Sequence, residues 1–388
     1  MSWVKSTDSA GWSPRWGHTS VVANNRIWVL GGGDDNRWKN DVWYSTDGVN
    51  WIEVTASAPW TARHGPASVA RNDTIWLFGG CDTVRFRNDV WYSADGLNWE
   101  RATASAPWSP RWGHRAVLFN NKIWLLGGED QDLILRNDVW YSTDGANWIL
   151  ATDSANWSPR CRHSAVVFDN KIWLLGGNDR SLRSDVWYST DGVNWILATP
   201  SALWPARGCY PAVVFDNKIW VIGGRDTIGL RNDVWYSSDG VNWTQANTSA
   251  PWSARRCHTL VAFQNKIWLL GGNDGGPKND VWYSAGLGIH SYETLKKPLA
   301  TYQISPNPFS DRTLIKYEPQ AKQGNKVNIA IYNLLGEKIK RFELGRSNGG
   351  TVIWDGRDNS GKRIASGIYF LRFTSDKYHS IEILRKIK

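Results

Sequence analysis

The feature that most constrains this chain is an internal repeat. Pairs of adjacent glycines recur at intervals of 48, 48, 49, 47 and 48 residues, and an arginine precedes each pair by sixteen residues. The stretch NDVWYSTDGVNW, which begins at Asn40, returns in near-identical form in the later units. Six units of about 48 residues therefore cover residues 1–285, and the fold of this region must be assembled from six similar modules.

Each unit is expected to form four β-strands. In the fourth unit HSAVVF (163–168) is a short apolar run, DN makes a tight turn, and KIWLLGG is a second apolar run. DVWYS and NWILAT, separated by a TDG turn, supply two further strands. Six four-stranded modules predict an all-β fold, a six-bladed β-propeller whose blades cover one another around a central channel.

The last unit lacks its fourth strand, because the chain leaves the repeat after NDVWYSAGLG. The first residues, SWVKSTDSAGW (2–12), match the fourth-strand segment NWILATDSANW (147–157). We therefore expect residues 2–8 to close the sixth blade, which would leave no open sheet edge.

The repeat PRWGHTSVVANNRIWVLGG…NDVWYSTDGVNW resembles the kelch repeat. In all six units a glycine pair is followed by a tyrosine, and in the first five a tryptophan then follows in kelch order. The resemblance implies a kelch-type propeller. The TDG segment is similar to an Asp-box turn but lacks one residue between Asp and Gly, so we interpret it as a tight hairpin.

Beyond residue 285 the repeat stops. Residues 286–301 have little periodicity and are expected to be a linker. Residues 302–388 contain short alternating runs separated by Gly, Asn and Asp, which predicts a small immunoglobulin-like β-sandwich. The markers SPNPF, YNLLGEKI and WDGRDNSGKRIASGIYF resemble the C-terminal sorting domain of type IX secretion. That resemblance implies export to the medium or the outer-membrane surface, with the export machinery as a partner, although no Sec leader is visible in this sequence.

Charge and composition argue against nucleic-acid binding, a membrane span and a disulfide framework. The net charge is +9, but residues 1–299 carry 29 basic and 28 acidic side chains, whereas residues 300–388 carry 16 and 8. A neutral propeller with a basic tail does not indicate nucleic-acid binding. No apolar run approaches the roughly 20 residues of a membrane span. The four cysteines are too scattered for a disulfide framework, and we expect a monomer without cofactor.

Two loops of each unit are expected at the same end of the propeller. One carries the repeat arginine, followed three residues later by His, Pro or Tyr, and the other carries an aspartate after the glycine pair. The arginines could form a cationic funnel for carboxylates or phosphates. Alternatively, each could pair with the aspartate of its own unit, for example Arg111 with Asp130, and the six-fold recurrence favours this structural role.

Positions where the repeat is broken are better candidates for function. Trp16, Trp38, Phe86 and Trp112 could form an aromatic patch over the first three blades, of the kind that sugars and protein partners use, or could simply pack between loops. Cysteines and histidines of the last three units come near one another, but no metal-ligand spacing occurs, so no metal site is expected.

These features predict an exported binding module that recognises a glycan or a protein through the arginine-bearing face. The alternative is a carbohydrate-active enzyme resembling the kelch-type sialic acid mutarotases, with Arg holding a carboxylate and His moving a proton. The candidate ligand-binding residues are Arg15, Arg63, Arg111, Arg160, Arg207, Arg255, His18, His114, His163, His258, Tyr210, Trp16 and Trp112.

Overall fold

The computed structural model describes residues 1–285, 300–319, 325–333, 338–347, 350–375 and 378–387. The chain divides into two compact units, Met1–Gly288 and Ile289–Lys388. The expected linker over residues 286–301 lies largely outside the described residues. The first described strand after it, β26, begins at Ala300.

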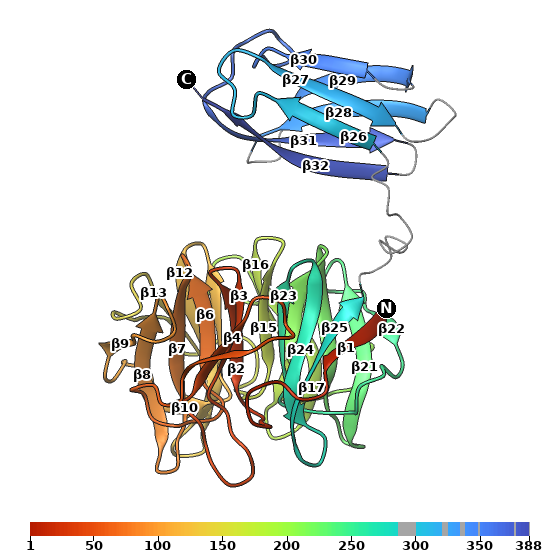
Figure 1. Cartoon of the computed structure of the whole chain (residues 1–388). Coiled ribbons are helices and arrows are strands. Elements are labelled where there is room, and N and C mark those ends of the chain that lie inside the picture. The colour runs from red at the N-terminus through yellow and green to blue at the C-terminus, as the bar shows by residue number, and fades with distance from the viewer. Residues whose placement is uncertain (286–299, 320–324, 334–337, 348–349, 376–377, 388) are drawn as a thin grey trace. The chain divides into compact units, whose positions relative to one another are not determined.

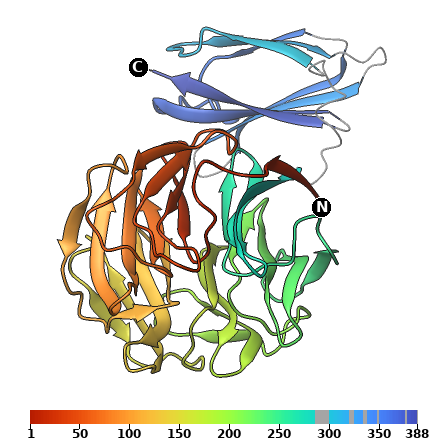
Figure 2. The same cartoon turned by 60° about the horizontal axis from the view of Figure 1, so that its bottom comes forward.

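The first unit is a ring of six antiparallel sheets around a central channel (Figures 1 and 2). Five of the sheets consist of consecutive strands, the sixth combines β23–β25 with β1, and the all-β fold is confirmed. The blades comprise β2–β5 (Thr19–Ala23, Arg26–Leu30, Val42–Ser45, Ile52–Thr55), β6–β9 (Ala67–Arg71, Thr74–Cys81, Phe86–Ser93, Glu100–Thr103), β10–β14 (Arg111–Trp112, Arg115–Phe119, Lys122–Asp130, Leu135–Ser142, Ile149–Thr152), β15–β18 (Ser164–Phe168, Lys171–Asn178, Leu182–Ser189, Ile196–Thr199), β19–β22 (Ala212–Phe215, Lys218–Arg225, Leu230–Ser237, Thr244–Asn247) and β23–β25 with β1 (Thr259–Phe263, Lys266–Asn273, Pro277–Ala285, Ser2–Thr7).

The two ends of this unit meet in the last blade. Strand β1 pairs antiparallel with β25, and Trp3 lies opposite Ser284 in their register. The innermost strand of that blade, β23, also contacts β2 of the first blade. The N-terminal strand thus supplies the edge that the sixth repeat lacks.

The core lies between neighbouring blades, where large tryptophans pack. Trp76 on β7 is 8 % exposed and packs against the TDG turn of the next blade. A Cβ atom on Gly145 of that turn would lie 2.0 Å from the Trp76 ring, and the residue has φ +80°. Glycine is therefore required there by both space and backbone conformation. The equivalent glycines of four further units meet a tryptophan of the preceding blade in the same way: Gly48, Gly96, Gly192 and Gly240.

The second unit is a two-sheet sandwich. One sheet has the order β26-β27-β30 and the other β29-β28-β31-β32 (Figure 1). Phe309 of the SPNPF motif contacts Trp354 with ring centroids 5.2 Å apart, inside the core shared by the two sheets. The strands are β26 (Ala300–Ser305), β27 (Thr313–Pro319), β28 (Asn325–Tyr332), β29 (Lys338–Ser347), β30 (Gly350–Trp354), β31 (Gly367–Ser375) and β32 (Tyr378–Lys386).

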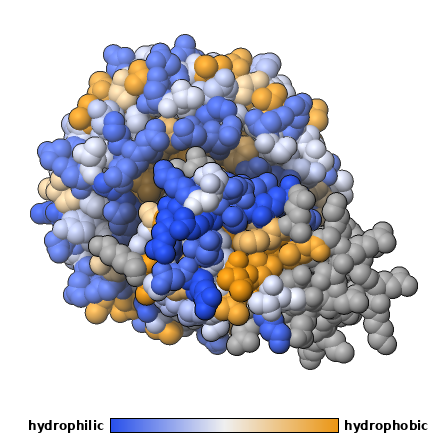
Figure 3. Space-filling model, turned by 90° about the horizontal axis from the view of Figure 1, so that it is seen from above, coloured by the Kyte–Doolittle hydropathy of each residue, from blue (hydrophilic) through white to orange (hydrophobic). Residues whose placement is uncertain are grey.

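The outer surface of the propeller is mixed in character. Figure 3 shows hydrophobic side chains around the ring in small groups, separated by hydrophilic ones. Exposed apolar residues on the outer strands include Ile52, Ile149 and Ile196, each about half exposed at 52, 54 and 52 %. Among the described residues, no helix has the length and apolar character needed to cross a membrane.

Candidate functional site

The six repeat arginines are buried structural residues. Each guanidinium is 0–1 % exposed and forms a two-pronged ion pair with an aspartate. In the third blade Arg111 donates to the two carboxylate oxygens of Asp138 at 2.6 and 2.8 Å, and to the carbonyl of Gly127 at 2.9 Å. Because their donors are already engaged inside the blades, these arginines do not form the exposed anion funnel that we considered. The other pairs are Arg15–Asp41, Arg63–Asp89, Arg160–Asp185, Arg207–Asp233 and Arg255–Asp280.

The expected pairing of Arg111 with Asp130 is wrong. The two residues are backbone partners between β10 and β12, but the Asp130 carboxylate is used within its own loop. It accepts hydrogen bonds from the N–H groups of Asp132 and Ile134 at 3.0 and 2.9 Å and pairs with Arg136. The aspartates after the glycine pairs therefore fix their loops, and the aspartates of the NDV segments hold the repeat arginines.

The predicted histidines and Tyr210 occupy one recurrent position between blades. Tyr210 donates a hydrogen bond of 2.7 Å to the carbonyl of Leu175 in the preceding blade. His114 faces the equivalent carbonyl of Phe78, and its ring lies against Gly79. Burial, together with the charge of Arg111, lowers the pKa of His114 to about 3. His18, His163 and His258 are buried in the same way, at 5, 0 and 3 % exposure.

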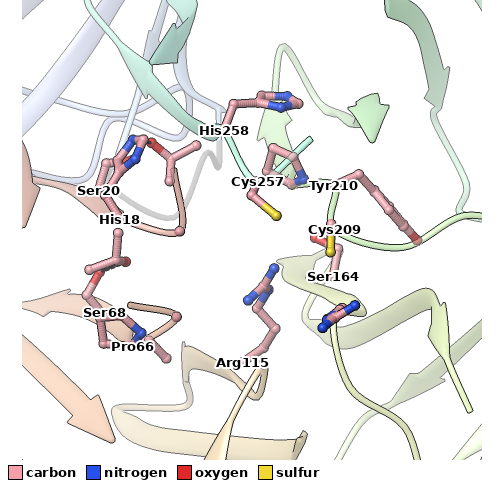
Figure 4. A pocket seen from close by; sticks show the side chains of 18 of the residues that line it. His18, Ser20, Pro66, Ser68, Arg115, Ser164, Cys209, Tyr210, Cys257 and His258 are labelled. Carbon is pink, nitrogen blue, oxygen red and sulfur yellow. Dashed lines mark hydrogen bonds between the residues drawn. The ribbon is translucent and has the colours of Figure 1, made fainter. Parts of the chain in front are cut away.

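A cavity of about 220 Å³ lies at the end of the channel reached by these loops, and all six blades line it (Figure 4). A belt of six equivalent residues with φ between 54° and 65° surrounds the axis at this level. Five backbone hydrogen bonds of 2.7–3.2 Å link neighbouring members of the belt. Three members are glycines and three carry side chains, so the cavity wall is asymmetric. The belt consists of Gly17, Gly65, Gly113, Arg162, Cys209 and Cys257.

Two arginines that break the repeat supply positive charge to the cavity. Arg115 stands where the other units have Thr, Ala, Ser or Pro, and Figure 4 shows its side chain extending into the open space. The guanidinium of Arg162 lies 4.6 Å from the centre of the Trp112 ring, and its Nε is buried without a hydrogen-bond partner. Neither arginine forms an ion pair within the described part of the chain. Burial lowers the pKa of Arg115, as expected for a cation withdrawn from water.

Aromatic rings form a connected cluster at the cavity mouth. Trp38 stacks on His64 with ring centroids 4.4 Å apart and an interplanar angle of 12°. Trp16 and Trp112 contact the same histidine at 5.2 and 4.9 Å, and Phe86 contacts Trp112 at 6.2 Å. Three of the four residues that we expected to form a patch therefore meet at His64, and Phe86 joins them through Trp112. All except His64 are partly exposed, and Trp16, His64 and Trp112 line the cavity.

Comparison with known proteins agrees with this architecture. Residues 1–128 and 113–285 match the family model described as the KLHDC2/KLHL20/DRC7 Kelch-repeats domain. This chain belongs to the kelch-repeat family. Residues 303–386 match the secretion system C-terminal sorting domain, so this kelch protein is a type IX secretion substrate that is secreted or held at the cell surface.

Solved structures resembling this kelch propeller include the one titled "Structure of YjhT". It superposes with a TM-score of 0.59 at 16 % identity and covers 71 % of this chain and 95 % of that chain. At this identity the likeness shows the fold. A comparison with curated proteins finds no match.

The cysteines of the kelch propeller differ sharply in environment. Cys209 and Cys257 line the cavity and are partly exposed, whereas Cys161 is 4 % exposed and Cys81 lies away from the cavity lining. Burial raises the pKa of Cys161 to about 12. Among the residues that the structure describes, no group of three or more His, Cys, Asp or Glu side chains could hold a metal ion.

Of the thirteen predicted site residues, five line the cavity: Trp16, His18, Trp112, Tyr210 and His258. The sequence-based prediction omitted Arg115 and Arg162. Both lie within four residues of a repeat arginine, at positions where the other five units have no arginine. A systematic comparison of the six units at these positions could have identified them.

Proposed function

We propose that this exported kelch propeller is a binding module for an acidic carbohydrate, held at the central cavity. The observation that carries the proposal is the pair Arg115 and Arg162, which have no ion-pair partner in the described chain and line the same cavity as partly exposed tryptophans. Guanidinium groups match the geometry of carboxylates, and aromatic faces pack against sugar rings. The site therefore combines the two contacts that an acidic sugar needs.

The size of the cavity favours one terminal sugar residue over an extended chain. At about 220 Å³ it is smaller than the roughly 300–1,000 Å³ typical of drug-sized pockets. The acidic group would enter toward Arg115, and Trp16 and Trp112 at the mouth would contact the ring. Longer glycans would then extend outward over the aromatic cluster.

Binding accounts for the site better than the enzyme alternative. In a proton-transfer mechanism a histidine would have to reach the ligand. His18 and His258 reach the cavity lining but are only 5 and 3 % exposed, and burial followed by the charge of Arg15 lowers the pKa of His18 to about 3. His64, at the mouth, is enclosed by aromatic rings, and burial followed by the charge of Arg162 lowers its pKa to about 4.

The proposal is tested by calorimetric titration of the full chain with N-acetylneuraminic acid and glucuronic acid, against galactose and glucose. We expect acidic sugars to bind and neutral ones to bind at least tenfold more weakly. Arg115→Ala and Arg162→Ala should each lower the affinity about tenfold or more, since hydrogen bonds to charged groups contribute about 1.5–3 kcal/mol.

Arg101→Ala on the outer strand β9 is the matched control. It removes the same charge from an exposed position outside the cavity and should leave the affinity unchanged. Equal affinity for neutral and acidic sugars, or full binding by the Arg115→Ala variant, would contradict the proposal.

A further inference from the structure

Cys209 and Cys257 are adjacent members of the cavity belt. The N–H of Cys257 donates to the carbonyl of Cys209 at 2.8 Å. Figure 4 shows both sulfur atoms on the cavity side, in the same space as Arg115. Two cysteines from different blades are thus neighbours at the cavity wall, although 48 positions separate them in the chain.

We propose that Cys209 and Cys257 are a reactive dithiol that is oxidised to a disulfide in the exported protein. The proposal rests on three observations: a backbone hydrogen bond joins the two residues, both line an open cavity, and the sorting domain sends the chain to an oxidising compartment. Both residues occupy equivalent belt positions with nearly equal backbone angles, φ 58° and 54°, so a bond between them would link two neighbouring blades.

The surroundings favour attack by Cys209. The neighbouring Cys257 thiol and the charges of Arg162, Arg256 and Arg115 outweigh burial and lower the pKa of Cys209. The neighbouring Cys209 thiol raises the pKa of Cys257. A thiolate is the reactive form of cysteine, so one partner is ready as nucleophile and the other retains its proton.

The oxidant is a disulfide, either a small molecule such as oxidised glutathione or a thiol–disulfide oxidoreductase. The Cys209 thiolate attacks one sulfur of that disulfide, forming a mixed disulfide and releasing one thiolate. Cys257 then loses its proton and attacks the Cys209 sulfur, which releases the second thiolate. The two cysteines lose two electrons and two protons, and the oxidant disulfide is reduced to two thiols.

Oxidation would also change the charge of the cavity. The effect of that change on ligand binding rests on the proposed function. In the reduced protein the Cys209 thiolate is a negative charge beside Arg115 and Arg162, and it competes with an acidic ligand. The disulfide is neutral. We therefore expect the oxidised protein to bind the acidic sugar several-fold more tightly than the reduced protein.

The disulfide itself is tested without any ligand. The full chain with an added Sec leader is purified from the periplasm, alkylated with iodoacetamide under denaturing conditions, and digested with trypsin. The expected product joins residues 208–218 to residues 257–266, and it should disappear after reduction. Cys161→Ser should still give this product, and Cys209→Ser should not.

The possible results distinguish the disulfide, the charge argument and the proposed function from one another. Four alkylated cysteines in protein exposed to oxidised glutathione, or a linkage that involves Cys161 or Cys81, would overturn it. If the linked peptides form but titration shows equal affinity in both redox states, the disulfide stands and the charge argument fails. If neither redox state binds an acidic sugar, the proposed function fails and the disulfide assignment is unaffected.

Discussion

Whether a side chain recurs in every blade distinguishes structural residues from functional ones in this protein. The repeat arginines appear in every blade, are buried, and meet the same partners in each. Arg115 and Arg162 each occur once, line the cavity, and lack a carboxylate partner in the described chain. A contact that stabilises one blade is copied with the blade, whereas a ligand needs one site. Symmetry therefore identifies the stabilising contacts, and departures from symmetry identify the site.

Arg111→Ala should destabilise the propeller by about 3–5 kcal/mol, because it leaves the Asp138 carboxylate largely buried and unpaired. Asp138→Ala should cost a similar amount, and the double variant should cost clearly less than the sum. Chemical denaturation of the four proteins measures this coupling. Lys171→Ala is the control: it pairs with Asp169, whose side chain is 70 % exposed, so the loss should stay within about 1 kcal/mol. Additive effects of the Arg111 and Asp138 changes would contradict the assigned pair.

Much of the arrangement of strands and blades could be predicted from the sequence. The period of about 48 residues fixes six blades, and the match between residues 2–12 and 147–157 places β1 beside β25. The partner of Arg111 could not be predicted, because two aspartates recur in every unit at suitable distances. Local hydrogen bonds decide between them: Asp130 is occupied by its own loop, and Asp138 on β13 remains free for the arginine. The repeat places the cysteines of the last three units near one another, but only the blade-to-blade hydrogen bond identifies Cys209 and Cys257 as the neighbouring pair in the cavity.

Truncation of residues 1–8 should destabilise the whole propeller. It removes β1, exposes the edge of β25, and removes Trp3, which is 7 % exposed and packs edge-on against Trp252 at 6.0 Å. We expect a clear drop in melting temperature. Trp3→Ala alone should cost about 3–5 kcal/mol, while Ile52→Ala, at an outer position, should cost little. An unchanged melting temperature in the truncated protein would show that β1 does not support the ring.

The buried histidines between blades should make stability depend on pH. His114 has a folded pKa of about 3, lowered by burial and by the charges of Arg111 and Arg115, against about 6.5 when unfolded. The unfolded chain binds the proton first as pH falls, so the stabilisation is complete above pH 6.5 and is lost progressively toward pH 3. Denaturant unfolding between pH 7 and 4.5 should show this loss. His114→Gln should reduce the slope by up to about 1.4 kcal/mol per pH unit; an unchanged slope would show that His114 is not the titrating group.

The whole chain combines a kelch propeller, for which we propose ligand binding, with an export signal. Each unit has its own core: the propeller packs tryptophans between blades, and the sandwich packs Phe309, Ile315, Trp354 and Leu384 between its two sheets. The charge divides in the same way, with a neutral propeller and a basic tail. From the separate cores and charge balances we predict that the two units fold independently. A variant can then lose export and keep the proposed ligand binding, or lose binding and keep export.

The sandwich should direct export without the propeller. A reporter carrying a Sec leader and residues 302–388 should reach the medium or the cell surface in a bacterium with type IX machinery, because the match to the sorting domain spans residues 303–386. The propeller with a leader but without this tail should remain in the periplasm and bind its ligand as tightly as the full chain. Phe309→Ala should abolish export of the reporter by disrupting the core contact with Trp354, whereas Ile353→Ala, at a position 55 % exposed, should not. Fractionation followed by protease accessibility distinguishes the compartments. Surface delivery of the tailless propeller would show that export depends on the propeller itself, and loss of ligand binding on removal of the tail would show that the two units do not function separately.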